Sequence, residues 1–487
     1  MTIIYKQLIA LLPLCTIGVT ILLILLNSAW KNNQIINMYI TNVGINLSIY
    51  LTKYCKHYIP IYISPLITID LFSIFCTTLI LLSNLTISLS SYIWLKKLPK
   101  NKRNEFYLLL LISSIGSIIL CSSEHFLTLF IGIELISITS FGIIGYDISS
   151  NKKKSIEITI HYILLSIVSS AFFLFGTSLL YSYFGELSFL KIKELLNNYT
   201  INHPVILTGL GMIITGIGFK LSIVPFHLLT PKIYQNLSSQ NIIFLTTSKI
   251  TIFLTTIRLF LHTSLNKNQT FCTLLMVLSS ISIILGTFMA LKQNNIKKLF
   301  SYSSITNFGY LTIGIITINK SYSLTIEAIG TYIIGYLISN IGIFNCISII
   351  SNIYSKEKNI HSLSFYKSLF WKHPYISLTF TISLLSFIGT PITLGFIGKI
   401  YIIILSIHNK LYWILPIIII GNIIQIIYYM YIITIMFLPE TETKKYIYTK
   451  YNKKNCFRNT IIITLTSIIT ILLGIHPQPL INILKSI

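Results

Sequence analysis

Four ionisable side chains lie inside long apolar stretches of this sequence: Glu134, Lys220, Lys249 and Lys399. A charged side chain at the centre of a bilayer costs about 2.5 to 3.5 kcal/mol on insertion scales, so it is seldom retained without a partner or a watery cavity. A row of groups that take up and release protons at modest cost is what a proton relay requires. These four residues are therefore predicted to carry protons.

Two histidines, His161 and His227, lie at or near the same depth as these charges. Histidine changes its charge near neutral pH, so either residue could pass a proton between the others. A structural or interfacial role explains His161 as well, and a helix cap or a packing contact explains His227. Other acids lie at the ends of apolar stretches, where water is expected to reach them: Asp70, Glu124, Glu157 and Glu327.

The buried charges also have simpler explanations. Lys399 could extend along its helix and place its amine at the membrane interface. Glu134 could be neutral and simply hydrogen-bonded. Lys249 lies too near the centre of its apolar stretch for an extension to the interface.

Proline and glycine interrupt the apolar stretches near two of the lysines. Pro225 follows Lys220 closely, and Gly389 and Pro391 precede Lys399. Proline ends or kinks a helix and frees backbone carbonyls that water or side chains can satisfy. Broken helices beside charges in two halves of a membrane protein are typical of transporters built from inverted repeats.

The composition indicates a membrane protein. Of the 487 residues, 54% are hydrophobic and only 10% are charged, whereas soluble domains carry about 25% charged residues. Apolar runs bounded by charged or turn residues predict about fourteen transmembrane helices, and hence an all-α polytopic membrane protein without a separate soluble domain. The predicted spans are 7–29, 33–52, 66–94, 106–122, 125–146, 157–183, 203–224, 238–261, 271–291, 302–318, 323–350, 375–405, 411–438 and 459–475.

Basic residues set the predicted orientation. The loops that follow odd-numbered spans hold 23 Lys and Arg residues, and the opposite side, both termini included, holds 10. Because basic loops stay on the cytoplasmic side, both termini are expected on the non-cytoplasmic side. The run Lys152–Lys154 is interpreted as part of this signal. The net charge of +24 would suggest nucleic acid in a soluble protein, but in a chain surrounded by membrane lipid no nucleic acid is expected.

The sequence contains no motif for a metal or a cofactor. Its seven cysteines occur singly, without the paired spacing that holds zinc, an iron–sulfur cluster or haem. Gly209, Gly211 and Gly216 do not form a dinucleotide-binding motif, and their place inside a span indicates helix packing. Neither a phosphate-binding loop nor a Ser-His-Asp order is present. No metal and no prosthetic group are therefore expected in this chain.

Ten short segments follow one another along the chain in an order that is specific to one family. They are Gly132–Leu135, Gly218–Ser222, Pro225–His227, Thr230–Pro231, Ser248–Lys249, Ala290–Leu291, Gln293, Ile296–Lys297, Tyr302–Ile305 and Gly395–Lys399. With these segments the chain resembles, over essentially its full length, the subunit N family of bacterial NADH-quinone oxidoreductase (respiratory complex I), whose mitochondrial counterpart is NADH dehydrogenase subunit 2. The related subunits L and M and the multisubunit cation/proton antiporters share the pattern of Glu, Lys and Pro. The stretch Gln7–Pro13 and the lack of long insertions favour subunit N.

The resemblance implies a single antiporter-like membrane domain over residues 1–487, with inverted five-helix repeats and discontinuous helices. The first repeat, over 105–262, would hold the relay residues Glu134, Lys220 and Lys249, and the second, over 271–438, would hold Lys399. One departure concerns His161, which stands before Tyr162 where bacterial members usually have lysine. Either His161 substitutes as a proton carrier or this position is dispensable.

The resemblance further implies a proton-translocating membrane-arm subunit of an NADH:quinone oxidoreductase, which is an enzyme of the translocase class. Electron transfer from NADH to quinone would drive the pumping, with NADH, FMN, iron–sulfur clusters and quinone bound in other subunits. The expected partners are other membrane-arm subunits, and the expected location is the bacterial inner membrane. The alternative is a subunit of a stand-alone multisubunit cation/proton antiporter, which would use the same buried charges without electron transfer.

Overall fold

The computed structural model describes residues 2–30, 33–146, 152–198, 203–263, 269–354, 360–439 and 453–487. The side chains of Lys152–Lys154, which contribute to the predicted orientation, lie outside this description. The chain divides into two compact units. Unit 1 comprises residues 1–221, 244–271 and 487, and unit 2 comprises residues 222–243 and 272–486.

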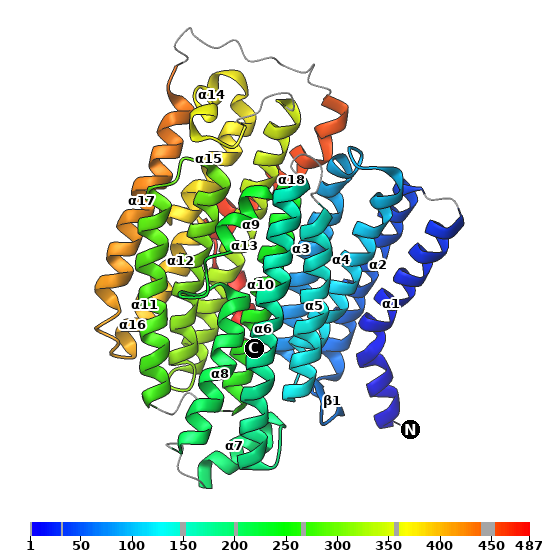
Figure 1. The fold of residues 1–487 in the computed structure, drawn as a ribbon, viewed down its shortest axis with the longest axis vertical. Coiled ribbons are helices and arrows are strands. Elements are labelled where there is room, and N and C mark those ends of the chain that lie inside the picture. The colour runs from blue at the N-terminus through cyan, green and yellow to red at the C-terminus, as the bar shows by residue number, and fades with distance from the viewer. Residues whose placement is uncertain are drawn as a thin grey trace. The chain divides into compact units, whose positions relative to one another are not determined.

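Unit 1 consists of long helices, of which α3, α4, α5 and α6 pack in sequence order (Figure 1). Helix α10 begins in unit 2 and continues through unit 1. The elements are α1 (Thr2–Trp30), α2 (Gln34–Cys55), the 3-10 turn Lys56–Tyr58, β1 (Ile61–Ser64), β2 (Ile67–Ile69), α3 (Leu71–Leu95), α4 (Lys100–Cys121), α5 (Phe126–Tyr146), α6 (Lys152–Phe184), α7 (Phe189–Asn198), α8 (Pro204–Leu221) and α10 (Ser239–Thr263).

Unit 2 is built around α13, which packs against α15, α16 and α18. Helix α13 is buried along most of its length, whereas α11 and α17 are buried on one side only. The elements are α9 (Thr230–Asn236), α11 (Gln269–Leu291), α12 (Ile296–Thr317), α13 (Tyr322–Ile353), the 3-10 turn Leu363–Tyr366, α14 (Leu369–Lys372), α15 (Pro374–Ile388), α16 (Leu394–His408), α17 (Leu415–Phe437), α18 (Lys453–Ile475) and α19 (Gln478–Lys485).

Every predicted span overlaps a helix, and the protein is a multi-pass membrane protein. Among the described residues, eleven helices are long and apolar enough to cross a membrane: α1, α3, α4, α5, α6, α8, α10, α11, α13, α17 and α18. Large apolar side chains such as Leu164, Ile167 and Phe175 of α6 are mostly exposed, as expected for helices solvated by lipid. Helices α2 and α12 are long but more polar, and α15 and α16 are short.

The two predicted helix breaks are confirmed. Helix α8 ends at Leu221, before Pro225, and α9 begins only at Thr230. The predicted span 375–405 is two helices, because Gly389 adopts a left-handed conformation (φ 79°) that ends α15. The Gly389 N–H bonds to the carbonyl of Leu385 at 3.0 Å, and this bond satisfies an otherwise open helix end.

A β-hairpin before α3 was not predicted. Strands β1 and β2 pair antiparallel over Ile61–Ile69, where the sequence predicts the start of a span at residue 66. Asp70 then starts the helix as a capping box, because its Oδ1 accepts from the Ser73 N–H at 2.8 Å and the Ser73 hydroxyl accepts from the Asp70 N–H at 2.9 Å. The chain therefore enters the helix five residues later than the apolar pattern indicates.

Small residues bring α6 and α8 close together in unit 1. A Cβ added to Gly209 would lie 3.1 Å from the Gly176 carbonyl, and one added to Gly216 would lie 2.8 Å from the Ser169 carbonyl. The interpretation of these two glycines as packing residues is therefore confirmed. Gly211 has open space beside it and does not share this role.

Candidate functional site: buried charges in two cavities

Unit 1 brings Lys220 of α8 and Lys249 of α10 to one cavity. Both side chains are only 8% exposed, which is unusual for lysine. The cavity holds about 30 Å³ of space open to water-sized molecules, enough for about two waters. Its polar lining consists of Ser137 and Ser140 from α5, Tyr162 from α6, Lys220, Ser248 and Lys249. The two lysines therefore share one cavity that has room for water.

Glu134 of α5 does not itself line this cavity, but it bonds to Ser137, which does, and it lies near enough to Lys220 for an electrostatic interaction. Its Oε2 accepts a hydrogen bond from the Ser137 hydroxyl at 2.9 Å. Its Oε1 is buried and has no hydrogen-bond partner among the described residues. A buried carboxyl oxygen of this kind is suited to accept a proton, or a hydrogen bond from a water molecule.

The amine of Lys220 is held by α6. Its Nζ donates to the Ser166 hydroxyl at 2.5 Å. Ser166 is buried and lies one helical turn after Tyr162, which lines the cavity. Lys220 therefore has a neutral hydrogen-bond acceptor on α6 and a carboxyl group near it on α5.

Lys399 of α16 lies in unit 2 beside a smaller cavity of about 20 Å³. Its Nζ donates to Gln425 Oε1 at 2.6 Å and to the Ile388 carbonyl at 3.1 Å. The Gln425 amide in turn donates to the Thr306 hydroxyl at 3.0 Å. These contacts join the lysine to the end of α15, to α17 and to α12, and they favour an internal position over an extension to the interface. The cavity is lined by Asn307, Tyr332, Gly335, Tyr336, Ser386, Phe387, Gly395 and Lys399.

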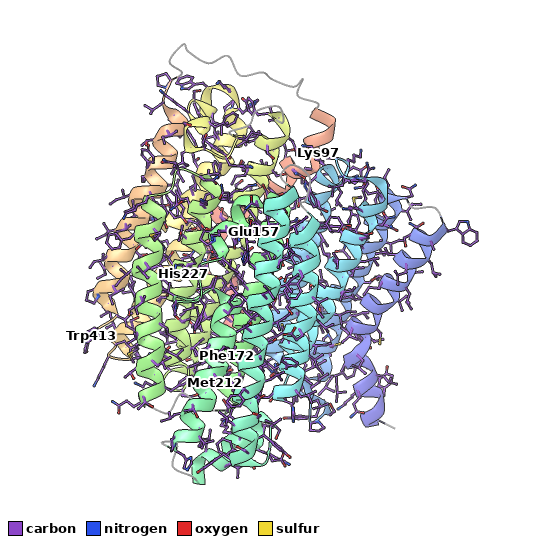
Figure 2. All side chains as sticks on the ribbon, viewed as in Figure 1. Lys97, Glu157, Phe172, Met212, His227 and Trp413 are labelled. Atoms are coloured by element: carbon purple, nitrogen blue, oxygen red, sulfur yellow. The ribbon has the colours of Figure 1, made fainter. Side chains whose placement is uncertain are left out.

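Neither of the two predicted histidines lines the cavities of the lysines. The His161 side chain is exposed on α6, and only its neighbour Tyr162 lines the cavity. His227 is half-buried in unit 2, in the segment between α8 and α9 (Figure 2). Its carbonyl accepts from the Thr230 N–H and hydroxyl at 3.1 and 2.8 Å, and its Nδ1 is buried without a partner among the described residues.

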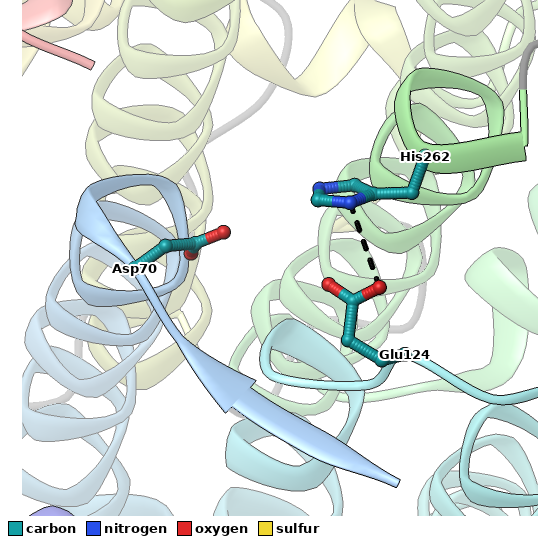
Figure 3. A group of neighbouring side chains, drawn as sticks. All are labelled: Asp70, Glu124 and His262. Carbon is teal, nitrogen blue, oxygen red and sulfur yellow. Dashed lines mark ion pairs between the residues drawn. The ribbon is translucent and has the colours of Figure 1, made fainter. Parts of the chain in front are cut away.

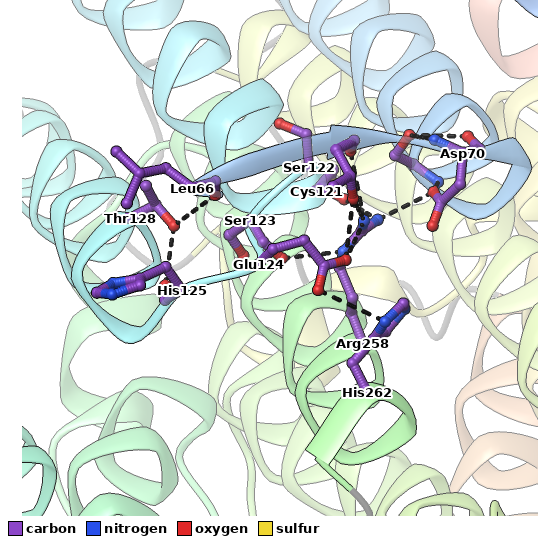
Figure 4. A network of polar contacts seen from close by, with 12 residues as sticks. Leu66, Asp70, Cys121, Ser122, Ser123, Glu124, His125, Thr128, Arg258 and His262 are labelled. Carbon is purple, nitrogen blue, oxygen red and sulfur yellow. Dashed lines mark hydrogen bonds and ion pairs between the residues drawn. The ribbon is translucent and has the colours of Figure 1, made fainter. Parts of the chain in front are cut away.

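Two of the acids expected to reach water are in fact buried. Glu124 and Glu327 are 4% and 5% exposed, whereas Glu157 is exposed at the start of α6 (Figure 2). Glu124 is buried because it pairs with Arg258, which lies near the end of the predicted span 238–261. Arg258 is fully buried and binds Glu124 Oε1 at 2.7 Å and Asp70 Oδ1 at 3.0 Å (Figure 4). A buried arginine needs such carboxylates, and its place inside a span is the only signal for this cluster in the sequence.

Asp70, Glu124 and His262 have the ligand types of a metal site, and their ligand atoms lie within 4.8 Å of one another (Figure 3). His262 Nδ1 lies 3.5 Å from Glu124 Oε2. The guanidinium of Arg258 already binds both carboxylates, so its positive charge would oppose a divalent cation at the same place. We therefore assign this group to an ion-pair cluster rather than to a metal.

Comparisons with known proteins identify the family and the fold of this chain. The family described as NADH:quinone oxidoreductase/Mrp antiporter, transmembrane region, matches residues 123–425, which is more than half of the chain. The fold is similar to a chain of respiratory complex I from Thermus thermophilus with bound aureothin, at 22% identity and a TM-score of 0.79, covering 96% of this chain and 98% of that one.

Two further solved structures have the same fold. One belongs to the membrane-bound sulfane sulfur reductase, an archaeal respiratory membrane complex, at 19% identity and a TM-score of 0.83, covering 99% of this chain and 97% of the other. The second belongs to the Mrp complex from Dietzia sp. DQ12-45-1b, at 15% identity and a TM-score of 0.83, covering 98% and 96%. This chain thus belongs to the family of antiporter-type membrane subunits that NADH:quinone oxidoreductases and Mrp antiporters share.

Proposed function

We propose that this chain is a proton-translocating membrane-arm subunit of an NADH-quinone oxidoreductase, in which electron transfer elsewhere in the enzyme drives protons through its buried charges. The observation that carries the proposal is the single cavity in unit 1 that Lys220 and Lys249 line, with Glu134 beside it. Two amines and a carboxylate around a space for water are the parts of a proton relay.

The proton transfer would begin at Lys220. An ionised Glu134 favours the protonated amine of Lys220, and moving the carboxylate away favours release of the proton. The proton would leave Lys220 Nζ for a water in the cavity, and a proton from water would bind Lys249 Nζ, so that one amine becomes neutral as the other becomes charged. Lys399 would load or discharge a proton in unit 2, where Gln425 orients its amine.

The remaining parts of the proposal concern the surroundings of the chain. We assign NADH, FMN, iron–sulfur clusters and quinone to other subunits, with other membrane-arm subunits as partners. The location would be the bacterial inner membrane, with both termini on the non-cytoplasmic side. His227 would assist transfer, whereas the exposed ring of His161 supports a dispensable position more than a substitute carrier.

The test uses the assembled complex in sealed membrane vesicles. Glu134→Ala and Lys220→Ala are each expected to lower the number of protons pumped per electron passed to quinone. Ile138→Ala is the matched control for α5, because Ile138 is 58% exposed and does not line the cavity. Normal pumping by both charge variants would refute the assignment.

A stand-alone cation/proton antiporter is the second candidate, since the Mrp complex has the same fold with a TM-score of 0.83. Purification of the assembly that contains this chain separates the two functions. An assembly that oxidises NADH with quinone supports the first, and sodium-dependent proton exchange without NADH oxidation supports the second.

A further inference from the structure

We propose that Arg258 is a positioning residue of the relay, which fixes the helix that bears Lys249 against the turn from which the helix of Glu134 begins. The inference rests on the proposed function, because it assigns Arg258 to the geometry of the same cavity. Arg258 itself does not line that cavity, so its effect would be exerted through the two helices.

The guanidinium of Arg258 is used completely. Arginine has five N–H donors in a planar fork. In this protein each of them donates to an acceptor within residues 68–124. The bonds run from Nε to the Ser123 carbonyl at 2.9 Å, from Nη1 to the Cys121 carbonyl at 2.8 Å and Asp70 Oδ1 at 3.0 Å, and from Nη2 to Glu124 Oε1 at 2.7 Å and Thr68 Oγ1 at 2.6 Å (Figure 4). Such a set defines both the position and the rotation of the end of α10.

Three of the acceptors, Thr68, Ser123 and Glu124, belong to a layer that is itself held by backbone bonds. We call it the capping layer and define it as residues 61–69, 122–125 and 187–189; Asp70 and Cys121 directly adjoin it. The Thr68 N–H bonds to the Ser122 carbonyl at 2.9 Å, and the Glu124 N–H bonds to the Leu66 carbonyl at 3.0 Å. On the other edge the Phe189 N–H bonds to the Glu124 carbonyl at 2.9 Å. Backbone hydrogen bonds therefore hold the turn 122–125 on both sides, so the acceptors that it offers to Arg258 are fixed in position.

The distances along the helices connect the capping layer to the relay. Helix α5 starts at Phe126, so Glu134 lies eight residues along it, about 12 Å at 1.5 Å per residue. Lys249 lies nine residues before Arg258 on α10, about 14 Å by the same rise. Because both relay groups stand at nearly the same height above the capping layer, a shift of α10 against the turn would move Lys249 relative to Glu134.

Stability alone is a poor explanation for a charge in this place. A buried ion cluster is often no more stabilising than well-packed apolar residues of similar volume, since the charges lose their hydration. Unlike apolar packing, the cluster is directional, because the planar, forked guanidinium can donate to its partners in only one arrangement. We therefore infer that Arg258 serves to position its helix rather than only to stabilise the fold.

The test compares two variants of the whole complex in vesicles. Arg258→Lys keeps the positive charge but cannot fork between Asp70 and Glu124. The triple variant Arg258→Met, Asp70→Asn, Glu124→Gln removes all three charges together and leaves no buried charge without a partner, and Asn still caps α3. Each assembled variant is expected to pump at most half the wild-type number of protons per electron. Loss of assembled complex alone would lower the total activity but not this ratio.

Arg103→Lys is the matched control, because Arg103 also donates to backbone carbonyls, of Leu98 and Lys96, but forms no described ion pair. It is expected to keep the wild-type ratio. A wild-type ratio in either assembled Arg258 variant would overturn the inference, and so would failure of both to assemble, which would assign Arg258 to stability. Lys249→Ala in the same assay separates the two proposals. If Lys249→Ala and the Arg258 variants all pump normally, the proposed function fails. If Lys249→Ala is impaired while the Arg258 variants pump normally, only the positioning role fails.

Discussion

At the scale of residues, two of the predicted relay lysines, Lys220 and Lys399, each bond to a neutral polar side chain. Ser166 accepts from Lys220, and Gln425 accepts from Lys399. Hydrogen bonds to a charged group contribute about 1.5 to 3 kcal/mol, so these neighbours influence how long an amine keeps its proton. The charged residues could be predicted from the sequence because they interrupt apolar stretches. Ser166 and Gln425 could not, because both are uncharged and only the tertiary structure brings them to the lysines.

Gln425 offers the most direct test at this scale. Gln425→Leu would remove the acceptor of Lys399 and the donor to Thr306, so we expect fewer protons pumped per electron and a loss of about 1 to 3 kcal/mol in stability. Proton pumping in vesicles and thermal denaturation in detergent measure the two effects. Gln34→Leu is the control, because Gln34 is also buried and donates to the Tyr92 carbonyl at 3.2 Å, far along the sequence from any relay lysine. An equal loss of pumping in both variants would contradict the role of Gln425.

His361 gives a pH dependence that lies outside the membrane spans. Its Nδ1 is buried without a partner among the described residues, and burial together with the nearby charge of Lys297 lowers its pKa from 6.5 to about 3. Between pH 6.5 and 3 the unfolded chain therefore binds a proton here that the folded chain does not. Stability should be unaffected by this group above pH 6.5 and should decrease as the pH falls toward 3.

The measurement is the thermal denaturation midpoint of the purified protein in detergent between pH 7.5 and 4. His361→Gln should denature at a midpoint that falls less steeply with acidity than that of the wild type. Identical slopes for the two proteins would show that His361 is not the group responsible.

At the scale of elements, the breaks in the helices could be predicted and the capping layer could not. Pro225 and Gly389 are local signals, since each acts on the backbone of its own helix. The hairpin 61–69 consists of strands of four and three residues, too short for a period of two to be recognised. Arg258 lies inside the predicted span 238–261, which indicates burial, but its partners in the hairpin and in residues 121–124 could not be predicted.

Gly395 tests the packing of the broken helix. A Cβ at this position would lie 1.8 Å from the Ser386 carbonyl, so α16 would have to move away from the end of α15. Gly395→Ala is expected to destabilise the protein by about 1 to 3 kcal/mol and to displace Lys399, four residues later, with a loss of pumping. Gly211→Ala is the control, because Gly211 has open space and alanine suits a helix better by about 0.5 to 1 kcal/mol. Equal denaturation midpoints for the two variants would refute this account of Gly395.

At the scale of the whole molecule, the sequence predicts the long apolar helices but not which side chains meet between them. Hydropathy and basic loops depend on the bilayer and are therefore visible along the chain. The meeting of Lys220 with Lys249, and the burial of Lys297 against the Leu237 carbonyl at 2.6 Å, depend on packing between helices. The sequence places Lys297 in a loop, between the predicted spans 271–291 and 302–318, although this lysine is only 4% exposed.

Orientation in the membrane is the prediction that depends on the whole chain. Each lysine near an anionic cytoplasmic surface gains about 1 kcal/mol, and the side with 23 basic residues should therefore face the cytoplasm even if Lys297 is removed from the count. Ser486→Cys and Lys97→Cys place exposed thiols on opposite predicted sides. In intact cells an impermeant maleimide should label Ser486→Cys above the background of the unsubstituted chain, and Lys97→Cys only after permeabilisation. The reverse labelling pattern would contradict the predicted orientation and place both termini in the cytoplasm.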